Sequence, residues 1–306
     1  MTTYTWQTVA VVDPEYMDRG QHIQEAIDLG NGVILGSIPS CIMHFGHLIG
    51  EKYLALRKAT LAFVVEYTAE MSAEPKPDER IREPLEKQDE ALNRIKNANL
   101  AVWLAHPSRL GCFLAFHAVQ ISDGSWLPTR FFTPQSFISN VRDLDAELTL
   151  NDFGLAHKLN AAIGDLSPDS SLTMATHAVV TALTVPFSPA RLAFFWIALE
   201  ALFGPDDPRE ITYRISQRIG LFLCPTDRAR AKQIYEKVKK GYRLRSKVMH
   251  GLRLAKISSE QWEELMHETE NLVRDGLVQI LSDPDLIEVF TGDQREIYLD
   301  GLAFAT

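Results

Sequence analysis

The sequence predicts a mainly α-helical protein, in which a smaller α+β domain over residues 1–150 precedes a C-terminal helical bundle over residues 151–306. The chain has 306 residues and a hydrophobic content of 46%, which is enough core-forming material for two domains. Strand-like and helix-like patterns both occur in the first half. After about Asn151 the strand patterns stop, and every strong segment has the spacing of a helix.

The first half opens with segments of different periodicity. Residues 32–39, "GVILGSIP", form a short apolar run between glycines and predict a buried strand. Residues 51–71 have the apolar spacing and length of a helix, and residues 85–105 predict a second helix. Residues 72–84 are charged and contain prolines, so we expect a solvated connection there.

A hairpin is predicted near the end of the α+β domain. The apolar segments 112–121 and 126–134 flank "SDGS", a turn-rich link of the kind that joins antiparallel strands. The aromatic side chains in and near this hairpin could stack on bases, but more often such residues fill a core between a sheet and a helix. We expect the core role for Trp103, Phe113, Phe116, Phe131 and Phe132.

The segment "SPARLAFFWIALEALFG" gives the clearest helix signal. Ser188 can act as its N-cap, Pro189 suits the first helical position, and Gly204 ends it. Its apolar residues share one stripe, which indicates a helix that faces a core.

Three further helices complete the predicted bundle, and their expected N-caps are Asp207, Thr226, and Ser258 or Ser259. Pro208 would occupy the first position of the first helix, and Pro225 would end it. The second helix is expected to run as far as His250. Four helices joined by short loops favour a bundle.

The composition limits the class of protein. A net charge of −9 and a pI of about 5.5 exclude a surface that attracts nucleic acid everywhere, so any polyanion site must be local. Cys41, Cys112 and Cys224 are odd in number and far apart, which argues against a disulfide framework and fits a reducing compartment. Without a signal-peptide pattern or a long apolar run, we expect a cytoplasmic protein that does not span a membrane.

One segment has the opposite charge from the rest of the chain. Residues 226–256 carry eleven Lys or Arg residues against two acidic residues, a local charge of +9. A charge run of this kind is often only a solvated helix face. Here Arg245 falls within about 80° of the apolar side chains of the same helix, so it points where the helix should bury apolar surface.

A guanidinium in that position needs an acidic partner on a neighbouring helix, because burying an unpaired charge is costly. Glu200 is the candidate, since it is the only charged residue in "FWIALEALFG". Two interpretations stay open. Glu200 and Arg245 can form an internal ion pair without chemistry, or they can belong to a catalytic site.

His250 is the second candidate for chemistry. It lies about 140° from Arg245 on an ideal helix, so the two share a site only if the helix unwinds at its end. Gly251 favours such an ending, and the helix dipole there favours the protonated imidazole. A histidine near neutral pKa beside an arginine is suited to phosphodiester chemistry.

These features together resemble the HEPN superfamily, and within it the ApeA-like HEPN domains of prokaryotes. The resemblance covers roughly Ser188 to Leu281 and depends on "FFWIALEALFG", then "ITYRISQRIGLFL", then "YRLRSKVMHG". In the last segment Arg245, Ser246 and His250 match the R-polar-x3-H motif of the family.

The resemblance implies a helical bundle that forms a two-fold homodimer, with the motifs of both subunits facing one cleft. Many family members are metal-independent endoribonucleases of toxin or antiviral systems, which leave 2′,3′-cyclic phosphate and 5′-hydroxyl ends. By this resemblance Arg245 would bind phosphate and stabilise the transition state, and His250 would be the general acid or base. Ser246 would support orientation or substrate contact.

The implied partner is RNA, which the basic side chains near the motif would contact. These are Lys240, Arg243, Lys247 and Arg253. An antitoxin or regulatory protein is a further possible partner. The alternative function is a noncatalytic RNA- or nucleotide-binding and dimerisation module, in which His250 would be dispensable.

No metal or cofactor is expected. Cys41, His44 and His47 have a spacing that could bind zinc, but no second close cluster completes a site, because His106, Cys112 and His117 are distant in sequence. Neither a Walker-type phosphate loop nor a dinucleotide-binding fingerprint is present in the sequence.

Overall fold

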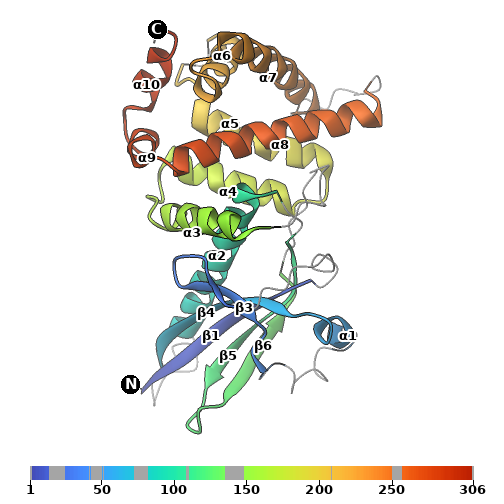
Figure 1. Cartoon of the computed structure of the whole chain (residues 1–306), viewed down its shortest axis with the longest axis vertical. Coiled ribbons are helices and arrows are strands. Elements are labelled where there is room, and N and C mark those ends of the chain that lie inside the picture. The colour runs from blue at the N-terminus through green and yellow to red at the C-terminus, as the bar shows by residue number, and fades with distance from the viewer. Residues whose placement is uncertain are drawn as a thin grey trace. The chain divides into compact units, whose positions relative to one another are not determined.

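The structure is a computed structural model, and it describes residues 2–13, 25–40, 42, 50, 52–71, 82–107, 110–134, 148–207, 209–249 and 257–304. The chain forms two compact units (Figure 1). Unit 1 comprises Met1–Phe137 and Asp143–Gly164, and unit 2 comprises Ile138–Arg142 and Asp165–Thr306. The predicted class is confirmed, because an antiparallel sheet with helices is followed by an all-helical region.

Unit 1 is built on a six-stranded sheet with the order β2-β3-β4-β1-β5-β6, in which all neighbours are antiparallel. The strands are β1 (Thr2–Val12), β2 (Ile27–Asp28), β3 (Val33–Ser37), β4 (Leu61–Met71), β5 (Cys112–Gln120) and β6 (Trp126–Phe132). The long strand β1 is central and pairs with both β4 and β5. The sequence prediction included β3 but not β1.

The helix predicted over residues 51–71 was wrong. Only α1 (Lys52–Leu56) is helical, and β4 then runs from Leu61 to Met71. The sequence "LAFVVEYTAEM" is rich in β-branched and aromatic residues, which fit a pleated and half-buried surface. Its pairing with β1 on one side and β3 on the other satisfies the backbone, and this decides the conformation.

The predicted hairpin is confirmed as β5 and β6. The turn between them is held by Asp123, whose carboxylate accepts hydrogen bonds from the backbone N–H of Ser125 at 2.8 Å and from its hydroxyl at 2.6 Å. Gly124 follows with a φ of 83°, which a residue with a side chain rarely adopts.

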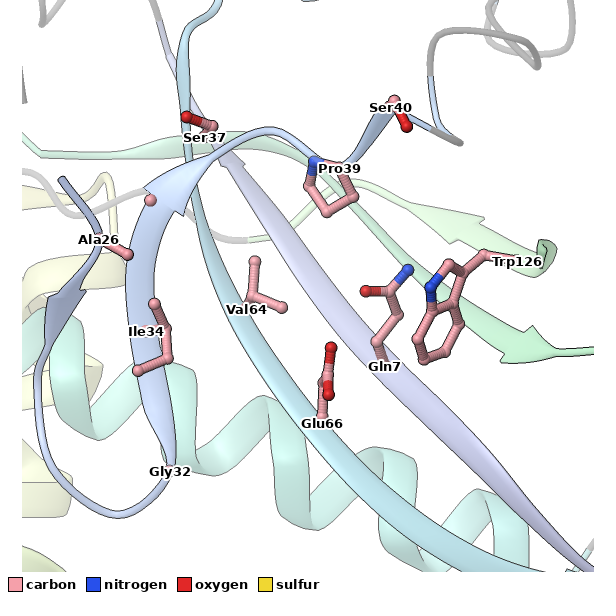
Figure 2. A pocket seen from close by; sticks show the side chains of 11 residues that line it. Gln7, Ala26, Gly32, Ile34, Ser37, Pro39, Ser40, Val64, Glu66 and Trp126 are labelled. Atoms are coloured by element: carbon pink, nitrogen blue, oxygen red, sulfur yellow. The ribbon is translucent and has the colours of Figure 1, made fainter. Parts of the chain in front are cut away.

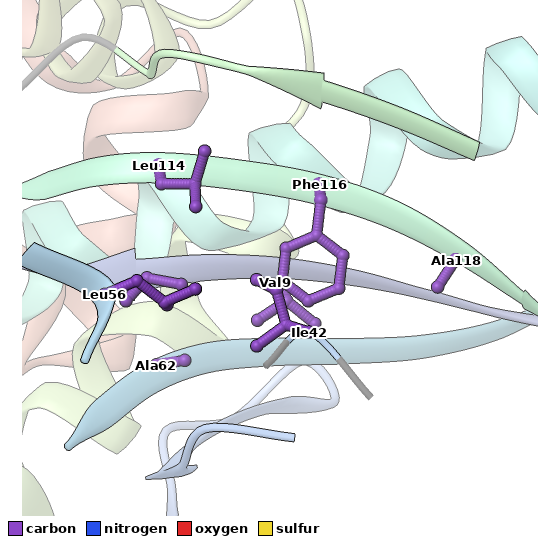
Figure 3. Packing of buried hydrophobic residues seen from close by; sticks show 8 residues of the cluster. Val9, Ile42, Leu56, Ala62, Leu114, Phe116 and Ala118 are labelled. Carbon is purple, nitrogen blue, oxygen red and sulfur yellow. The ribbon is translucent and has the colours of Figure 1, made fainter. Parts of the chain in front are cut away.

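Both faces of the sheet are apolar at its centre. One face carries a buried cluster that includes Val9, Leu114 and Phe116, with Leu56 of α1 packed against them (Figure 3). Since side chains alternate along a strand, the buried Phe63 and Val65 point to the other face. The helix α2 (Arg82–Ala105) packs against the sheet and covers that second face.

The helix α3 (Leu150–Gly164) packs on α2 and belongs to unit 1. Asn160 of α3 donates from its amide to the carbonyl oxygens of Leu29 at 2.9 Å and Gly30 at 3.1 Å. These contacts place α3 in the same unit as the sheet. The domain boundary predicted near residue 150 assigns α3 to the C-terminal domain instead.

Unit 2 is helical throughout its described part. Its helices are α4 (Ser171–Thr184), α5 (Ser188–Phe203), α6 (Ile211–Leu223), α7 (Arg228–Met249), α8 (Ser259–Leu281), α9 (Pro284–Thr291) and α10 (Arg295–Gly301). The helix α5 contacts α4, α6, α7 and α8, and its buried residues include Phe195, Trp196 and Leu199. It is therefore the central helix of unit 2. In the described part of the chain no helix is long and apolar enough to cross a bilayer.

Most helix ends fall near their expected positions, with corrections at three caps. Ser258 caps α8 through a capping box with Gln261, as expected. Ser188 is the first helical residue of α5 rather than its cap. The N-cap of α6 is Glu210 instead of Asp207, and Asp227 instead of Thr226 accepts the N–H of Arg230 at the start of α7.

Candidate functional site

The two side chains expected to pair, Glu200 and Arg245, lie together in unit 2. Nη2 of Arg245 on α7 donates to Oε2 of Glu200 on α5 at 3.0 Å. The side chains are 21% and 24% exposed, respectively, so the pair is shielded without being cut off from solvent. An ion pair in this setting is stronger than one on an open surface.

Two aromatic rings support the pair from the α5–α7 interface. The guanidinium carbon of Arg245 lies 5.5 Å from the ring centre of Tyr242, a cation–π distance. Tyr242 in turn meets Trp196 edge-on, with ring centres 5.3 Å apart. Burial raises the pKa of Tyr242 to about 12, and the charge of Glu200 and a hydrogen bond to it add to that effect.

The close approach of α7 to α5 requires Gly241. A Cβ atom at this position would lie 2.9 Å from Cζ2 of Trp196, which is closer than carbon atoms pack. The missing side chain therefore allows Tyr242 and Arg245, on the next turn of α7, to reach Trp196 and Glu200.

Three polar side-chain atoms at the α5–α7 interface lack a hydrogen-bond partner within the described part of the chain. Oε1 of Glu200, Nε of Arg245 and Nε1 of Trp196 are buried and have no hydrogen-bond partner among the residues that the structure describes. Buried polar groups usually have partners, because leaving one unpaired costs about 1–3 kcal/mol. The cost of these unpaired atoms is one that the packing of α5 against α7 must offset.

The other predicted site residues lie along the solvent side of α7. Lys240, Arg243 and Lys247 are exposed, and Ser246 is half-buried. Arg243 and Arg245 are two residues apart and so point about 200° from each other around the helix. The basic surface and the ion pair are therefore on different sides of α7.

Several predicted residues lie outside the described part of the chain. They are His250 and Arg253 of the basic segment, and Cys41, His44 and His47 of the zinc-like spacing. Within the described residues, no group of three or more His, Cys, Asp or Glu side chains could hold a metal ion.

The sequence reasoning missed a groove between α6 and α7. It has a volume of about 850 Å³ and is lined by Glu210, Ile211, Thr212, Tyr213, Tyr235, Lys239 and Arg243. Three of these residues follow one another at intervals of four along α7, a spacing that places them on one helix face. That signal was visible in the sequence, but the contribution of α6 was not.

A second hollow lies on the sheet of unit 1, with a volume of about 490 Å³. Gln7 of β1 and Glu66 of β4 are direct partners across the two strands, and their side chains project from the same face of the sheet (Figure 2). The indole of Trp126 from β6 lies beside them (Figure 2). No motif in the sequence indicated this hollow.

His117 is buried among packed side chains, which indicates a structural role. Its ring Nδ1 lies 2.8 Å from the hydroxyl of Thr8, and its ring stacks on Phe132. Burial, together with the charge of Arg130, lowers the pKa of His117 to about 4, so the imidazole is neutral at physiological pH. Burial likewise raises the pKa of the Cys112 thiol to about 12, which makes it unreactive.

The comparisons with known proteins give no match: neither family models, nor curated proteins, nor solved structures resemble this chain closely enough to be matched.

Proposed function

We propose that this protein is a metal-independent endoribonuclease of the HEPN type, acting in a toxin or antiviral defence setting. The observation that carries the proposal is the shielded pair between Arg245 and Glu200, which fixes a guanidinium on the last described turns of α7. His250 follows directly after this helix in the sequence, at the spacing of the R-polar-x3-H motif.

In the proposed reaction the 2′-oxygen of a ribose attacks the adjacent phosphorus. His250 takes the 2′-hydroxyl proton while water protonates the leaving 5′-oxygen, or water takes the first proton while His250 gives the second, and Arg245 stabilises the extra negative charge on the phosphate. The P–O5′ bond breaks as the P–O2′ bond forms. The products carry a 2′,3′-cyclic phosphate and a 5′-hydroxyl, and the balance needs no oxidant or cofactor.

Glu200 is proposed as a positioning residue. It binds Nη2 of Arg245 at 3.0 Å, and because Nε is buried this leaves Nη1 for a phosphate. Ser246, half-buried on the next position of α7, would orient the substrate or contact it.

RNA and a second copy of the chain are the proposed partners. Exposed Lys240, Arg243 and Lys247, together with Arg253, would supply local positive charge for the RNA backbone. A two-fold dimer would bring two such segments to one cleft. An antitoxin or regulatory protein would bind the same surface to hold the enzyme inactive.

A noncatalytic RNA- or nucleotide-binding and dimerisation module is the second candidate. The observation in its favour is that Arg245 is only 21% exposed and already engaged by a carboxylate. In that case the pair would hold α5 and α7 together, and His250 would have no role in RNA binding.

The test is cleavage of a mixed-sequence RNA in the presence of EDTA. Wild type and His250→Ala are compared, with His177→Ala as the matched control because His177 is exposed on α4. We expect wild type and the control to cut equally, and His250→Ala to lose at least about 100-fold in rate. Equal cutting by His250→Ala, or binding without cutting by wild type, would instead favour the noncatalytic module.

A further inference from the structure

The groove between α6 and α7 combines two aromatic rings with two cations. Tyr213 on α6 is 49% exposed, which is high for a large aromatic side chain. Its ring meets that of Tyr235 on α7 edge-on, with centres 6.0 Å apart and planes at 73°. The contact with Tyr235 fixes the orientation of the Tyr213 ring, while about half of the Tyr213 side chain remains exposed.

The cations come from the same face of α7. Nζ of Lys239 lies 5.2 Å from the ring centre of Tyr235, and Arg243 is one helical turn further on and exposed. Neither Lys239 nor Arg243 forms an ion pair with any residue that the structure describes. Among the described residues that line the groove Glu210 is the only acid, so positive charge is in excess there.

We propose that this groove binds an unpaired nucleotide of a single-stranded RNA, with the base stacked on Tyr213 and the phosphates beside Lys239 and Arg243. Aromatic faces with flanking cations are the recurring means of holding single strands, because every base has a face to stack and every linkage carries a charge. The groove volume of about 850 Å³ lies within the range of about 300–1,000 Å³ that is typical of ligand sites. The acid Glu210 can accept a hydrogen bond from a ribose hydroxyl or a base amino group.

The groove shares its face of α7 with one residue of the motif. Tyr235, Lys239 and Arg243 are spaced by four residues, and Ser246 continues the same face of α7 toward its C-terminal end. A strand bound in the groove and extending along this face would reach Ser246 of the motif, whereas Arg245 lies on the other side of α7. The inference rests on the proposed function in one respect, namely that RNA is the ligand.

The test measures binding apart from cleavage. A fluorescently labelled single-stranded RNA of about ten nucleotides, with 2′-O-methyl groups at every ribose, cannot form a cyclic phosphate, so fluorescence anisotropy reports the Kd of the full chain alone. We expect Tyr213→Ala to weaken binding by about 5- to 150-fold, the loss of one base stack, and Tyr213→Phe to bind like wild type.

Charge controls separate the groove from the general basic surface. Lys239→Gln is compared with Lys232→Gln, because Lys232 is an exposed cation on the same helix that does not line the groove. We expect Lys239→Gln to weaken binding several-fold more than Lys232→Gln. Crosslinking of a 4-thiouridine RNA to the wild type, followed by peptide mapping, is expected to mark Tyr213 or Tyr235 without any substitution.

The outcomes distinguish the two proposals. Binding that depends on Tyr213, with no cleavage of natural RNA, would leave the groove standing and remove the endoribonuclease. Cleavage of natural RNA, with equal binding by Tyr213→Ala and wild type, would overturn the groove and keep the enzyme. No measurable binding of the RNA, or capture of an acidic protein by the same tyrosine in its place, would also overturn the groove proposal.

Discussion

At the scale of single residues, Glu200 and Arg245 show how an apolar pattern locates a polar site. Each is a charge placed where its helix should bury apolar surface, and each can be tolerated there only because the other is present. This physical requirement made the pair predictable from the sequence. The edge-on support from Trp196 and the role of Gly241 were not predictable, because both depend on how closely α7 approaches α5.

Removing one charge of the pair is expected to destabilise the protein. Glu200→Gln leaves the guanidinium of Arg245 shielded and without a carboxylate, which should lower the free energy of unfolding by about 1–3 kcal/mol. Urea unfolding measures the change. Glu263→Gln is the control, because Glu263 is an exposed acid on α8, and its effect should be within about 0.5 kcal/mol. Equal effects of the two variants would mean that the ion pair contributes nothing to the free energy of unfolding.

The phenol of Tyr242 should ionise late. Its pKa in the folded protein is raised to about 12 by burial and by Glu200, whereas the unfolded chain ionises near its ordinary value of about 10. The stability that this group contributes is therefore complete below about pH 10 and is lost as the pH rises through 12. Ultraviolet absorbance titration of wild type minus Tyr242→Phe should show ionisation near pH 12. A difference curve centred near pH 10 would contradict the burial of Tyr242 beside Glu200.

At the scale of elements, the C-terminal helix α10 is attached to α6 by a charged network. Arg218 on α6 is almost fully buried, and its guanidinium binds Glu296 at 2.7 Å and Asp300 at 2.6 Å. Arg214, one turn away, shares both carboxylates. Burial opposes the ionisation of Glu296 and Asp300, but the hydrogen bonds and charge of Arg218 outweigh it and lower the pKa of each.

This network should make α10 sensitive to acid. Lowered pKa values mean that the carboxylates contribute stability above their unfolded pKa values, about pH 4–4.5, and lose it as the pH falls below them. We expect the unfolding free energy of wild type to fall below about pH 4.5 more steeply than that of a Glu296→Gln, Asp300→Asn variant. Denaturation curves at several pH values measure this, and parallel profiles would contradict it.

The fit between α5 and α7 gives a further prediction. Gly241→Ala places a Cβ atom 2.9 Å from the indole of Trp196, so the helices must move apart, and we expect a loss of about 1–3 kcal/mol. The control is Gly154→Ala on the exposed side of α3, where nothing lies within 4 Å of the new atom. Alanine is the better helix former, so the control should gain about 0.5–1 kcal/mol. Two variants that are both stabilised would contradict the close contact.

The incorrect predictions from the sequence also concern whole helices and strands. Residues 61–71 are a strand because β1 and β3 pair with them, and an isolated segment does not contain that information. The strand β1 was missed although "YTWQTVAVV" is rich in β-formers, since its partners come from distant segments. The helices of unit 2 were predictable because their backbone hydrogen bonds are local and their end signals lie within the segment.

At the scale of the whole molecule, charge is strongly segregated. The chain has a net charge of −9, yet residues 226–256 alone carry +9, so the remainder is far more acidic than the total suggests. Such segregation favours a local polyanion site and keeps the rest of the surface from binding nucleic acid indiscriminately. The ion pair, the basic surface and the groove all involve α7, which makes this helix the functional centre of the proposal.

The central proposal is that this protein cleaves RNA with a 2′-hydroxyl as the nucleophile. The most direct measurement is cleavage in EDTA of one labelled RNA and of a copy with a single 2′-deoxy sugar on the 5′ side of the cut linkage, with analysis of the ends. We predict that the RNA is cut to 2′,3′-cyclic phosphate and 5′-hydroxyl ends and that the copy resists cutting at that linkage. Cutting of both substrates alike, products with 5′-phosphate ends, or no cutting of either would contradict the claim.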